Sequence, residues 1–346
     1  MNQQEHRKNE HVSLATKQFQ EETATTTRLA EVRLVPQTMP EIGLDDVDLT
    51  TTIAGQPTTA PFFINAMTGG TPETGKLNQQ LATAAKETGI AMATGSESVA
   101  LRSAAAQPSF AIVRQINPDG VVLGNISATT SPETAQKAVD LIKANALEIH
   151  VNAAQELTMP EGETDFRWRK NITAIAQRVN VPVIVKEVGQ GIDPRTLRIL
   201  NRLPVAGVDL GGRGGTNFIT IENGRRSHHD MAYLEDWGLT TAESLLVARE
   251  LAPELTVTAT GGIRTPLDVA KCLALGADNV GIAGFFLHVL IKHDLATLIQ
   301  TIGWFKDQLK RIMVLCGCKT IAELQQAPYL LSPELQQTVE QLLAIK

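Results

Sequence analysis

The sequence of 346 residues is poor in cysteine and contains no long apolar run. Its three cysteines are Cys272, Cys316 and Cys318, and no second Cys/His pair stands at zinc-finger spacing, so we expect reduced packing residues. No stretch reaches the roughly 18 apolar residues that a membrane helix needs, and the polar start MNQQEHRKNEH is unlike a secretory signal. We therefore expect a cytoplasmic protein that does not contact a membrane.

The chain also lacks a block of lysine and arginine. Its formal net charge is -6, and no basic cluster is large enough to hold a phosphate backbone, so nucleic acid is not an expected partner. Hydrophobic residues make up 43% and charged residues 20%, which is typical of a globular chain with a large core. The length would suit two average domains, but a barrel of eight strand-helix units also occupies about this length.

Short apolar runs alternate with longer amphipathic ones after a polar opening of about sixty residues. This alternation is typical of strand-helix units around a parallel sheet. Capping residues stand before proline where helices should begin, as in Ser131-Pro132, Asp193-Pro194 and Thr265-Pro266. The eight predicted strands are 62–66, 90–94, 121–124, 147–151, 182–186, 205–210, 256–260 and 279–283.

A closed (β/α)8 TIM barrel fits this pattern better than a doubly wound open sheet. An open sheet would need a glycine-rich dinucleotide turn after its first strand, and residues 65–70 do not supply one. We therefore predict an α/β protein with a single barrel domain over 1–346. It would comprise an N-terminal extension (1–60), the strands and connecting helices (61–285) and C-terminal helices (286–346). The long connections 152–165 and 211–240 are candidate active-site loops.

Glycines follow the last two predicted strands, in Gly261-Gly262-Ile263-Arg264 and in the segment 281–284. Barrels of this type commonly hold a phosphate at these two loops. Glycine lets backbone N–H groups approach an anion, the next helix adds its dipole, and Arg264 could add a guanidinium. The alternative is that these glycines only form tight turns. Their coincidence at both strands favours the phosphate of a cofactor.

Residues around the rest of the mouth narrow the choice of cofactor. Lys186 ends the fifth predicted strand, where a lysine can neutralise the N1/O2 edge of a reduced isoalloxazine ring, which indicates FMN. The alternative is an ion pair of Lys186 with Glu187 or another carboxylate. Residues 66–70 supply backbone beside a flat ring, and Thr216 could complete the cradle. Ser96 and Asn125, which follow the second and third predicted strands, are further candidates.

Several motifs together resemble the FMN-dependent type 2 isopentenyl diphosphate isomerases, and the resemblance runs from residue 7 to about residue 284. The motifs are RKNEH (7–11), MTGG (67–70), GS (95–96), HVNAAQE (150–156), KEVG (186–189), GGTNF (214–218), GGIR (261–264) and AG (283–284). By resemblance, the FMN contacts are Met67, Thr68, Gly69, Ser96, Asn125, Lys186, Thr216, Gly262, Arg264, Ala283 and Gly284.

The same resemblance implies a site for isopentenyl diphosphate. Its diphosphate would meet Arg7 and Lys8, so the N-terminal extension would close over the barrel mouth, and Glu156 would hold Mg2+. Gln155 would act as the catalytic residue beside the reacting hydrocarbon. The other implied substrate contacts are Ser96, Ser98, His150 and Asn152. Many relatives have arginine where this chain has Ser98, so a contact made by that arginine is absent or replaced here.

The implied reaction interconverts isopentenyl and dimethylallyl diphosphate by a 1,3-allylic proton shift, a step of isoprenoid biosynthesis. An unactivated alkene needs an acid that works in dry surroundings, and reduced flavin can give and take a proton at N5. NADPH would visit only transiently to reduce the flavin, because the sequence has no Rossmann unit. Magnesium uses few protein carboxylates, which makes Glu156 a sufficient ligand.

Two other functions remain open. An FMN-dependent 2-hydroxy acid oxidase or dehydrogenase would share the phosphate end and the lysine, but it needs a histidine base, and the segment 209–215 has none beside it. A non-catalytic flavin- or phosphate-binding barrel would leave Gln155 and Glu156 without a purpose. His228 and His229 could line a lid over the diphosphate or simply be solvated. The apolar C-terminal helices suggest a homo-oligomer, a tetramer or larger.

Overall fold

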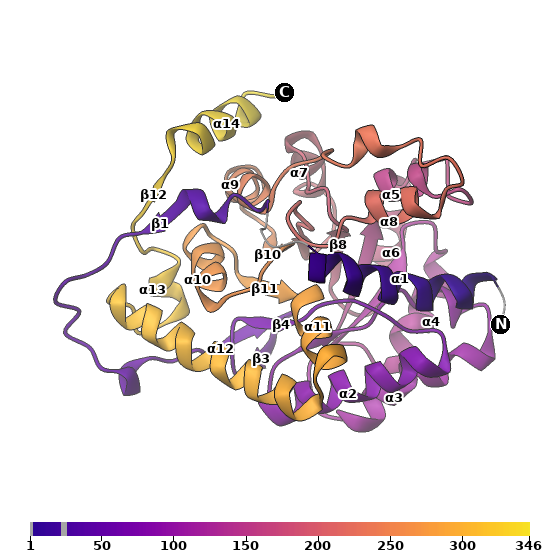
Figure 1. The fold of residues 1–346 in the computed structure, drawn as a ribbon, viewed down its shortest axis with the longest axis horizontal. Coiled ribbons are helices and arrows are strands. Elements are labelled where there is room, and N and C mark those ends of the chain that lie inside the picture. The colour runs from indigo at the N-terminus through magenta and orange to yellow at the C-terminus, as the bar shows by residue number, and fades with distance from the viewer. Residues whose placement is uncertain (1–2, 22–25) are drawn as a thin grey trace.

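A computed structural model describes residues 3–21 and 26–346, and it describes only the backbone of residues 3–9 and 11. Eight parallel strands close into a barrel in the order β10-β11-β4-β5-β6-β7-β8-β9 (Figure 1). The closed barrel and all eight predicted strands are thereby confirmed. The strands are β4 (Phe62–Ile64), β5 (Met92–Ala93), β6 (Val122–Ser127), β7 (Ala146–Val151), β8 (Val183–Glu187), β9 (Gly207–Asp209), β10 (Thr256–Thr260) and β11 (Asn279–Ile282).

Helices connect the strands around the outside of the barrel. The three predicted caps form, because the side chains of Ser131, Asp193 and Thr265 each accept a hydrogen bond from a backbone N–H in the first helical turn, with proline following the cap. The connecting helices are α2 (Pro72–Thr88), α3 (Pro108–Ile116), α4 (Pro132–Ile142), α5 (Ala153–Thr158), α6 (Arg169–Arg178), α7 (Pro194–Leu200), α8 (Phe218–Arg225), α9 (Thr241–Leu251) and α10 (Pro266–Ala274), and the last barrel strand is followed by α11 (Gly284–Lys292) and α12 (Leu295–Leu315).

A hairpin of β2 (Thr51–Ile53) and β3 (Gln56–Thr58) closes the amino-terminal end of the barrel. Ile53 is buried there in one apolar cluster with inward-facing strand residues that include Phe63, Leu123 and Ile184. Because alternate strand residues point into the barrel, these side chains fill its lower interior. The polar residues that follow the strands therefore gather at the opposite, carboxyl end.

The N-terminal helix α1 (Gln3–Glu21) packs beside α11 at that carboxyl end (Figure 1). The ring of Phe19 lies 6.2 Å from the ring of Phe285 and 4.7 Å from that of His288, measured between centroids. Gln18 Oε1 accepts a hydrogen bond of 3.0 Å from the backbone N–H of Asn217. The N-terminal extension thus contacts the loops that follow β9 and β11.

A two-stranded sheet joins the segment after α1 to the C-terminal part of the chain. β1 (Val32–Leu34) pairs antiparallel with β12 (Tyr329–Leu331), which lies between the short helix α13 (Ile321–Leu324) and the terminal helix α14 (Pro333–Leu343). In the described residues all three cysteines are free, and Cys272 and Cys318 are buried, as expected for packing residues. None of the helices in this part of the chain is long and apolar enough to span a membrane.

Candidate active site

Two neighbouring cavities open at the carboxyl end of the barrel. The first, called here the glycine cavity, is lined by the loops after β9, β10 and β11 and by α1. The second, the polar cavity, is lined mainly by the loops after β5 and β7 and by Asn125 of β6. The residues common to both linings are Ala66, Met67, Lys186, Val188 and Phe218. A ligand in one cavity would therefore lie against a ligand in the other.

Backbone forms much of the wall of the glycine cavity. Gly262 has a φ of +69°, and a Cβ at this position would run into the carbonyl oxygen of Gly214, so only glycine fits. Helix α11 begins at Gly284 without a side-chain capping bond at Ala283, which leaves its first N–H groups for another acceptor. These N–H groups and the helix dipole would suit an anion, and the anion site itself stays a prediction.

Most of the predicted cofactor contacts line this glycine cavity. They are Met67, Thr68, Lys186, Thr216, Gly262, Arg264, Ala283 and Gly284. The guanidinium carbon of Arg264 lies 4.4 Å from the ring centroid of Phe19, close enough for a cation–π contact. Val12, Ala15 and Phe19 of α1 also line the cavity. Helix α1 therefore gives it an apolar cover.

Lys186 is held by Asp209. Its Nζ lies 2.5 Å from Asp209 Oδ2, which also accepts a hydrogen bond of 2.7 Å from Asn65 Nδ2. Burial, the largest single effect, lowers the pKa of Lys186, but the charges of Asp209, Glu148 and Glu187 and the hydrogen bond to Asp209 together raise the pKa above its usual value. The ammonium therefore stays charged between the two cavities.

Glu187, the partner considered first from the sequence, lies on the other face of β8 because successive strand residues alternate. Its Oε2 accepts from the backbone N–H groups of Gly189 and Gln190, each at 2.6 Å. Burial raises the pKa of Glu187 to about 8, although these N–H donors oppose the shift. The ion pair of Lys186 thus involves another carboxylate, the second possibility left open by the sequence.

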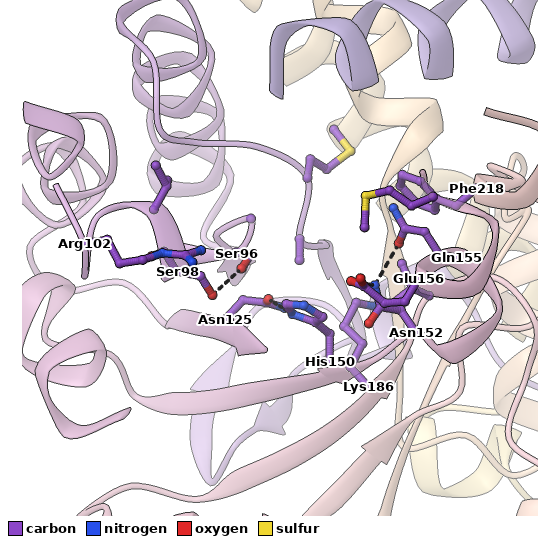
Figure 2. A pocket seen from close by; sticks show the side chains of 16 residues that line it. Ser96, Ser98, Arg102, Asn125, His150, Asn152, Gln155, Glu156, Lys186 and Phe218 are labelled. Carbon is purple, nitrogen blue, oxygen red and sulfur yellow. Dashed lines mark hydrogen bonds between the residues drawn. The ribbon is translucent and has the colours of Figure 1, made fainter. Parts of the chain in front are cut away.

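The polar cavity has two ends (Figure 2). Ser96, Ser98 and Arg102 stand at one end, and Gln155 and Phe218 at the other. Ser96 Oγ donates to Ser98 Oγ at 3.0 Å. The side chains of Asn125 and His150 lie between the two ends, and His150 Nδ1 is 2.9 Å from Asn125 Oδ1. The predicted residues Ser96, Ser98, Asn125, His150, Asn152, Gln155 and Glu156 all line this cavity.

The amide of Gln155 is oriented by hydrogen bonds on both sides. Asn152 Nδ2 donates to Gln155 Oε1 at 3.1 Å, and Gln155 Nε2 donates to Glu222 Oε1 at 3.0 Å. Glu222 is in turn paired with Arg225, whose Nη1 lies 2.5 Å from Glu222 Oε2. Because each partner allows only one assignment of amide oxygen and nitrogen, the side chain presents a fixed dipole.

Glu156 points into the same region and already has hydrogen-bond partners. Its Oε1 accepts from Asn152 Nδ2 at 3.0 Å, and its Oε2 accepts from the backbone N–H of Glu163 at 2.9 Å. Each carboxylate oxygen keeps a second lone pair for another ligand. No group of three or more potential metal-binding side chains occurs among the described residues, so a cation here would rely on few protein ligands.

Two fully buried carboxyl groups near the cavity were missed by the sequence analysis. Glu148 Oε2 accepts from Asn125 Nδ2 at 2.9 Å, and Glu97 Oε1 accepts from the backbone N–H of Asn125 at 3.2 Å. Burial raises the pKa of Glu97 to about 8. The signal was present, because an acidic residue inside a predicted buried strand, as at Glu148, is rare unless it has partners. Arg102, which also lines the polar cavity, was not predicted, because it lies outside the motif that contains Ser96.

Other predicted residues lie elsewhere. Gly69 lines neither cavity, because its backbone packs against the ring of Phe110, into which a Cβ would run. Asn125 lies inside β6 and not after it, since this strand continues to Ser127. Like Ser96, it lines the polar cavity and not the glycine cavity.

The structure places neither of two predicted residue pairs in a cavity. The side chains of one pair are not described, and the other pair lies outside both cavities. Arg7 and Lys8 belong to helix α1, but their side chains lie outside the described residues. His228 and His229 line neither cavity, and His229 Nδ1 lies 2.9 Å from the backbone oxygen of Asn223. The loop that carries the two histidines is thus tied to the end of α8.

Comparison with known proteins defines the class first. Residues 102–331 match the family model of FMN-dependent dehydrogenases. A solved structure of a mandelate oxidase variant with an FMN adduct has a TM-score of 0.65 at 17% identity, covering 93% of this chain and 92% of that chain. Mandelate oxidase with benzoyl-formic acid gives a TM-score of 0.65 at 16% identity, covering 93% and 90%. The fold is that of the FMN-dependent dehydrogenase barrels.

Curated relatives define the family within this class. The isopentenyl-diphosphate delta-isomerase of Lacticaseibacillus paracasei is 49% identical over 334 residues, which cover 96% of each chain. That of Staphylococcus saprophyticus is 45% identical over 341 residues, which cover 98% of this chain and 97% of the relative. The chain belongs to the FMN-dependent, type 2 family of isopentenyl-diphosphate delta-isomerases, which confirms the resemblance found in its motifs.

Proposed function

We propose that the chain interconverts isopentenyl and dimethylallyl diphosphate by a 1,3-allylic proton shift, with reduced FMN in the glycine cavity and the substrate in the polar cavity. The observation that carries the proposal is the shared wall of the two cavities, where Lys186, Met67 and Phe218 line both. A flat cofactor ring at this wall would face a substrate directly. The relatives named as isomerases, which are 42% to 49% identical to this chain, support the same reaction.

The residues of the glycine cavity fit FMN. The hydroxyl of Thr68 is buried at the cavity and has no hydrogen-bond partner among the described residues, so it is ready to bond a ligand. Arg264, Gly262 and the N-terminus of α11 suit the phosphate, and Lys186 suits the N1/O2 edge of the ring. When bound, FMN supplies at N5 a group that can give and take a proton in dry surroundings.

Gln155 suits a position beside the reacting hydrocarbon. Its amide is neutral, so its dipole can stabilise positive charge that develops on the substrate. A carboxylate in this place could instead form a covalent bond to the cationic carbon. The hydrogen bonds to Asn152 and Glu222 keep the amide dipole in one orientation. Met67 and Phe218 add apolar walls that help to exclude water. Gln155 is therefore the proposed catalytic residue.

The diphosphate would lie in the polar cavity with Mg2+ on Glu156. Magnesium keeps several waters and needs only one or two carboxylates, which suits a carboxylate that has a free lone pair on each oxygen. Hydroxyl and imidazole groups of Ser96, Ser98 and His150 line the same cavity. Arg7 and Lys8 complete the proposed anion site from α1. We further propose transient reduction by NADPH, a cytoplasmic location and a homo-oligomer.

The family model and the mandelate oxidase structures favour a second candidate, the oxidation of a 2-hydroxy acid. That chemistry needs a histidine base beside the flavin. No histidine lines the glycine cavity in the part of the chain that the structure describes, and His150 in the polar cavity is bonded to Asn125. The isomerase is therefore the better-supported function.

One assay separates the two candidates. The purified protein is loaded with FMN, reduced under anaerobic conditions and incubated with Mg2+ and isopentenyl diphosphate, and dimethylallyl diphosphate is measured. We expect product with reduced FMN and none with oxidised FMN. In parallel, the oxidised protein is mixed with mandelate and other 2-hydroxy acids, which should leave the flavin absorbance unchanged. Bound, reduced FMN without any isomer formed would refute the proposal.

A further inference from the structure

The single ammonium of Lys186 faces two carboxyl groups in the closed interior of the barrel. Asp209 has an exposed fraction of 0% and Glu148 of 1%, and both interact electrostatically with Lys186. The three residues lie on the neighbouring strands β7, β8 and β9. If both carboxyl groups were ionised, the three buried residues together would carry one uncompensated negative charge.

Asp209 is the better supported of the two carboxylates. Besides Lys186 it accepts hydrogen bonds from Asn65 Nδ2, from the hydroxyl of Thr260 and from the backbone N–H of Gly211. Four donors thus hold this one carboxylate, and one of them is the ammonium of Lys186 in a direct ion pair.

Glu148 has much less support. Among the described residues it accepts one hydrogen bond, from Asn125 Nδ2 at 2.9 Å. Burial raises the pKa of Glu148 to about 7; the charge of Lys186 opposes the shift and that of Asp209 adds to it. A small change in the charge near Lys186 is therefore enough to decide whether Glu148 carries a proton.

The surroundings of Glu148 contain few other charges. On β6 its neighbour is the neutral side-chain amide of Asn125, whose backbone N–H bonds to Glu97. On its own strand, His150 contacts the oxygen of the same amide. Glu187 on β8 bonds to the loop N–H groups on the other face of the strand. Within the described residues, Lys186 and Asp209 are thus the charged groups that act on Glu148 most strongly.

We propose that Glu148 takes up one proton from solvent when FMN in the glycine cavity is reduced, and releases it when the flavin is oxidised. This inference rests on the FMN site proposed above. Reduced FMN with a proton at N5 keeps a negative charge at its N1/O2 edge, beside Lys186. The ammonium would then be shared with a third anion, the reduced flavin. The Glu148 carboxylate would be stabilised less by Lys186 and would be repelled by the flavin, so its protonated form would be favoured.

The charges and protons balance. The reductant, NADPH in the proposed function, would supply FMN with two electrons and one proton as a hydride, and a proton from solvent would convert the Glu148 carboxylate to the carboxylic acid. Before reduction, Lys186, Asp209 and Glu148 sum to one negative charge beside a neutral ring. Afterwards Glu148 is neutral, the ring is negative, and the sum is the same. Glu148 would touch no reacting atom. It would act through Lys186, by compensating the negative charge of the reduced flavin, and is therefore a positioning residue and not a catalytic one.

The midpoint potential of bound FMN, measured against pH with redox dyes, tests the proposal. For a two-electron couple, each proton taken up contributes about 30 mV per pH unit. Below about pH 7 Glu148 carries its proton in both states, so the slope of the wild type should be about 30 mV. Above that value the slope should steepen to about 60 mV, until Glu148 is ionised in the reduced state as well. A wild-type slope of about 30 mV throughout would overturn the proposal.

Two variants identify the group. Glu148→Gln keeps the hydrogen-bonding shape but cannot titrate, so its slope should stay near 30 mV per pH unit. Glu97→Gln is the matched control, because it removes another buried carboxyl group bonded to Asn125 that does not interact with Lys186. It should keep the steep region. If Glu97→Gln loses the steep region as well, the assignment to Glu148 is wrong.

A direct count of protons gives a second readout. Anaerobic reduction with reduced methyl viologen, which donates electrons without releasing protons, in weak buffer with a pH indicator above about pH 7, should consume two protons per FMN in the wild type and one in Glu148→Gln. A full flavin spectrum shows that a variant is folded and loaded. If the protein binds no FMN, the proposed function fails together with this inference. If it binds FMN and isomerises the substrate but consumes equal numbers of protons in both forms, only this inference fails.

Discussion

The amide nitrogen of Gln155 donates to Glu222 Oε1 over 3.0 Å, although the two residues are 67 positions apart in the chain. The bond joins helix α5, which follows β7, to helix α8, which follows β9. Glu222 is fully buried and paired with Arg225. The proposed catalytic side chain is therefore held by a neighbouring loop of the barrel as well as by its own.

Gln155→Ala should lower kcat by about 100-fold or more, because the oriented amide beside the substrate is lost. The absorbance spectrum of bound FMN should not change, since Gln155 does not line the glycine cavity. Glu222→Gln should have a smaller effect, because a glutamine oxygen can still accept the bond from Gln155. Loss of the flavin spectrum in Gln155→Ala would contradict the assigned role.

Glu156→Gln should raise the Mg2+ concentration needed for half-maximal activity, since an amide oxygen binds this cation more weakly than a carboxylate. The matched control is Glu163→Gln. Only the backbone N–H of Glu163 contacts Glu156, so this variant should give the wild-type Mg2+ titration. An unchanged titration in Glu156→Gln would remove Glu156 as a ligand.

Deletion of the residues before Asn9 should raise the KM for isopentenyl diphosphate strongly, because Arg7 and Lys8 are lost with it. The double variant Arg7→Ala/Lys8→Ala should do the same without shortening α1. Lys17→Ala, at an exposed position of the same helix, is the control and should leave KM unaffected. Wild-type KM values in the shortened protein would rule out the proposed diphosphate contacts.

Gly262→Ala should greatly weaken FMN binding. Its φ of +69° disfavours any side chain, and the new Cβ would push the loop away from the carbonyl oxygen of Gly214. Gly303→Ala in α12 provides the comparison, because a Cβ there meets no atom within 4 Å and should leave FMN binding unaltered. Equal FMN affinities in both variants would show that the backbone at Gly262 does not form the phosphate site.

The pH dependence of stability should change in Glu187→Gln. The pKa of Glu187 is raised from the usual 4.5 to about 8, so between these values the folded state holds a proton that the unfolded state has lost. The free energy of unfolding of the wild type therefore falls through this window. The variant cannot titrate and should gain stability relative to the wild type as pH rises, by up to a few kcal/mol. Urea unfolding at both ends of the window measures this, and a difference that does not vary with pH would contradict it.

The sequence predicted the barrel well because its signals are local. Alternating apolar runs mark the strands, and caps followed by proline, as at Ser131 and Thr265, mark the helix starts. The glycines after β10 and β11 are local signals too, while the phosphate site assigned to them rests on their position in the barrel and stays a prediction.

The contacts between strands could not be predicted in this way. Whether Lys186 pairs with Glu187 or Asp209 depends on which face of β8 each side chain occupies and on which strand comes next to it. Gly69 was assigned to the flavin through its motif, whereas the close packing of Phe110 that requires a glycine is visible only in three dimensions. Glu148 was overlooked for a related reason, because its significance depends on the lysine of the neighbouring strand.

The hairpin β2–β3 limits the routes by which substrate and product can enter and leave the barrel. Ile53 and its apolar neighbours fill the amino-terminal end of the barrel, so the described residues leave no passage there. Substrate and product would then both pass through the carboxyl end, beside which α1 packs. A product molecule that lingers would therefore block the next substrate, and the speed with which the entrance clears sets an upper limit on turnover.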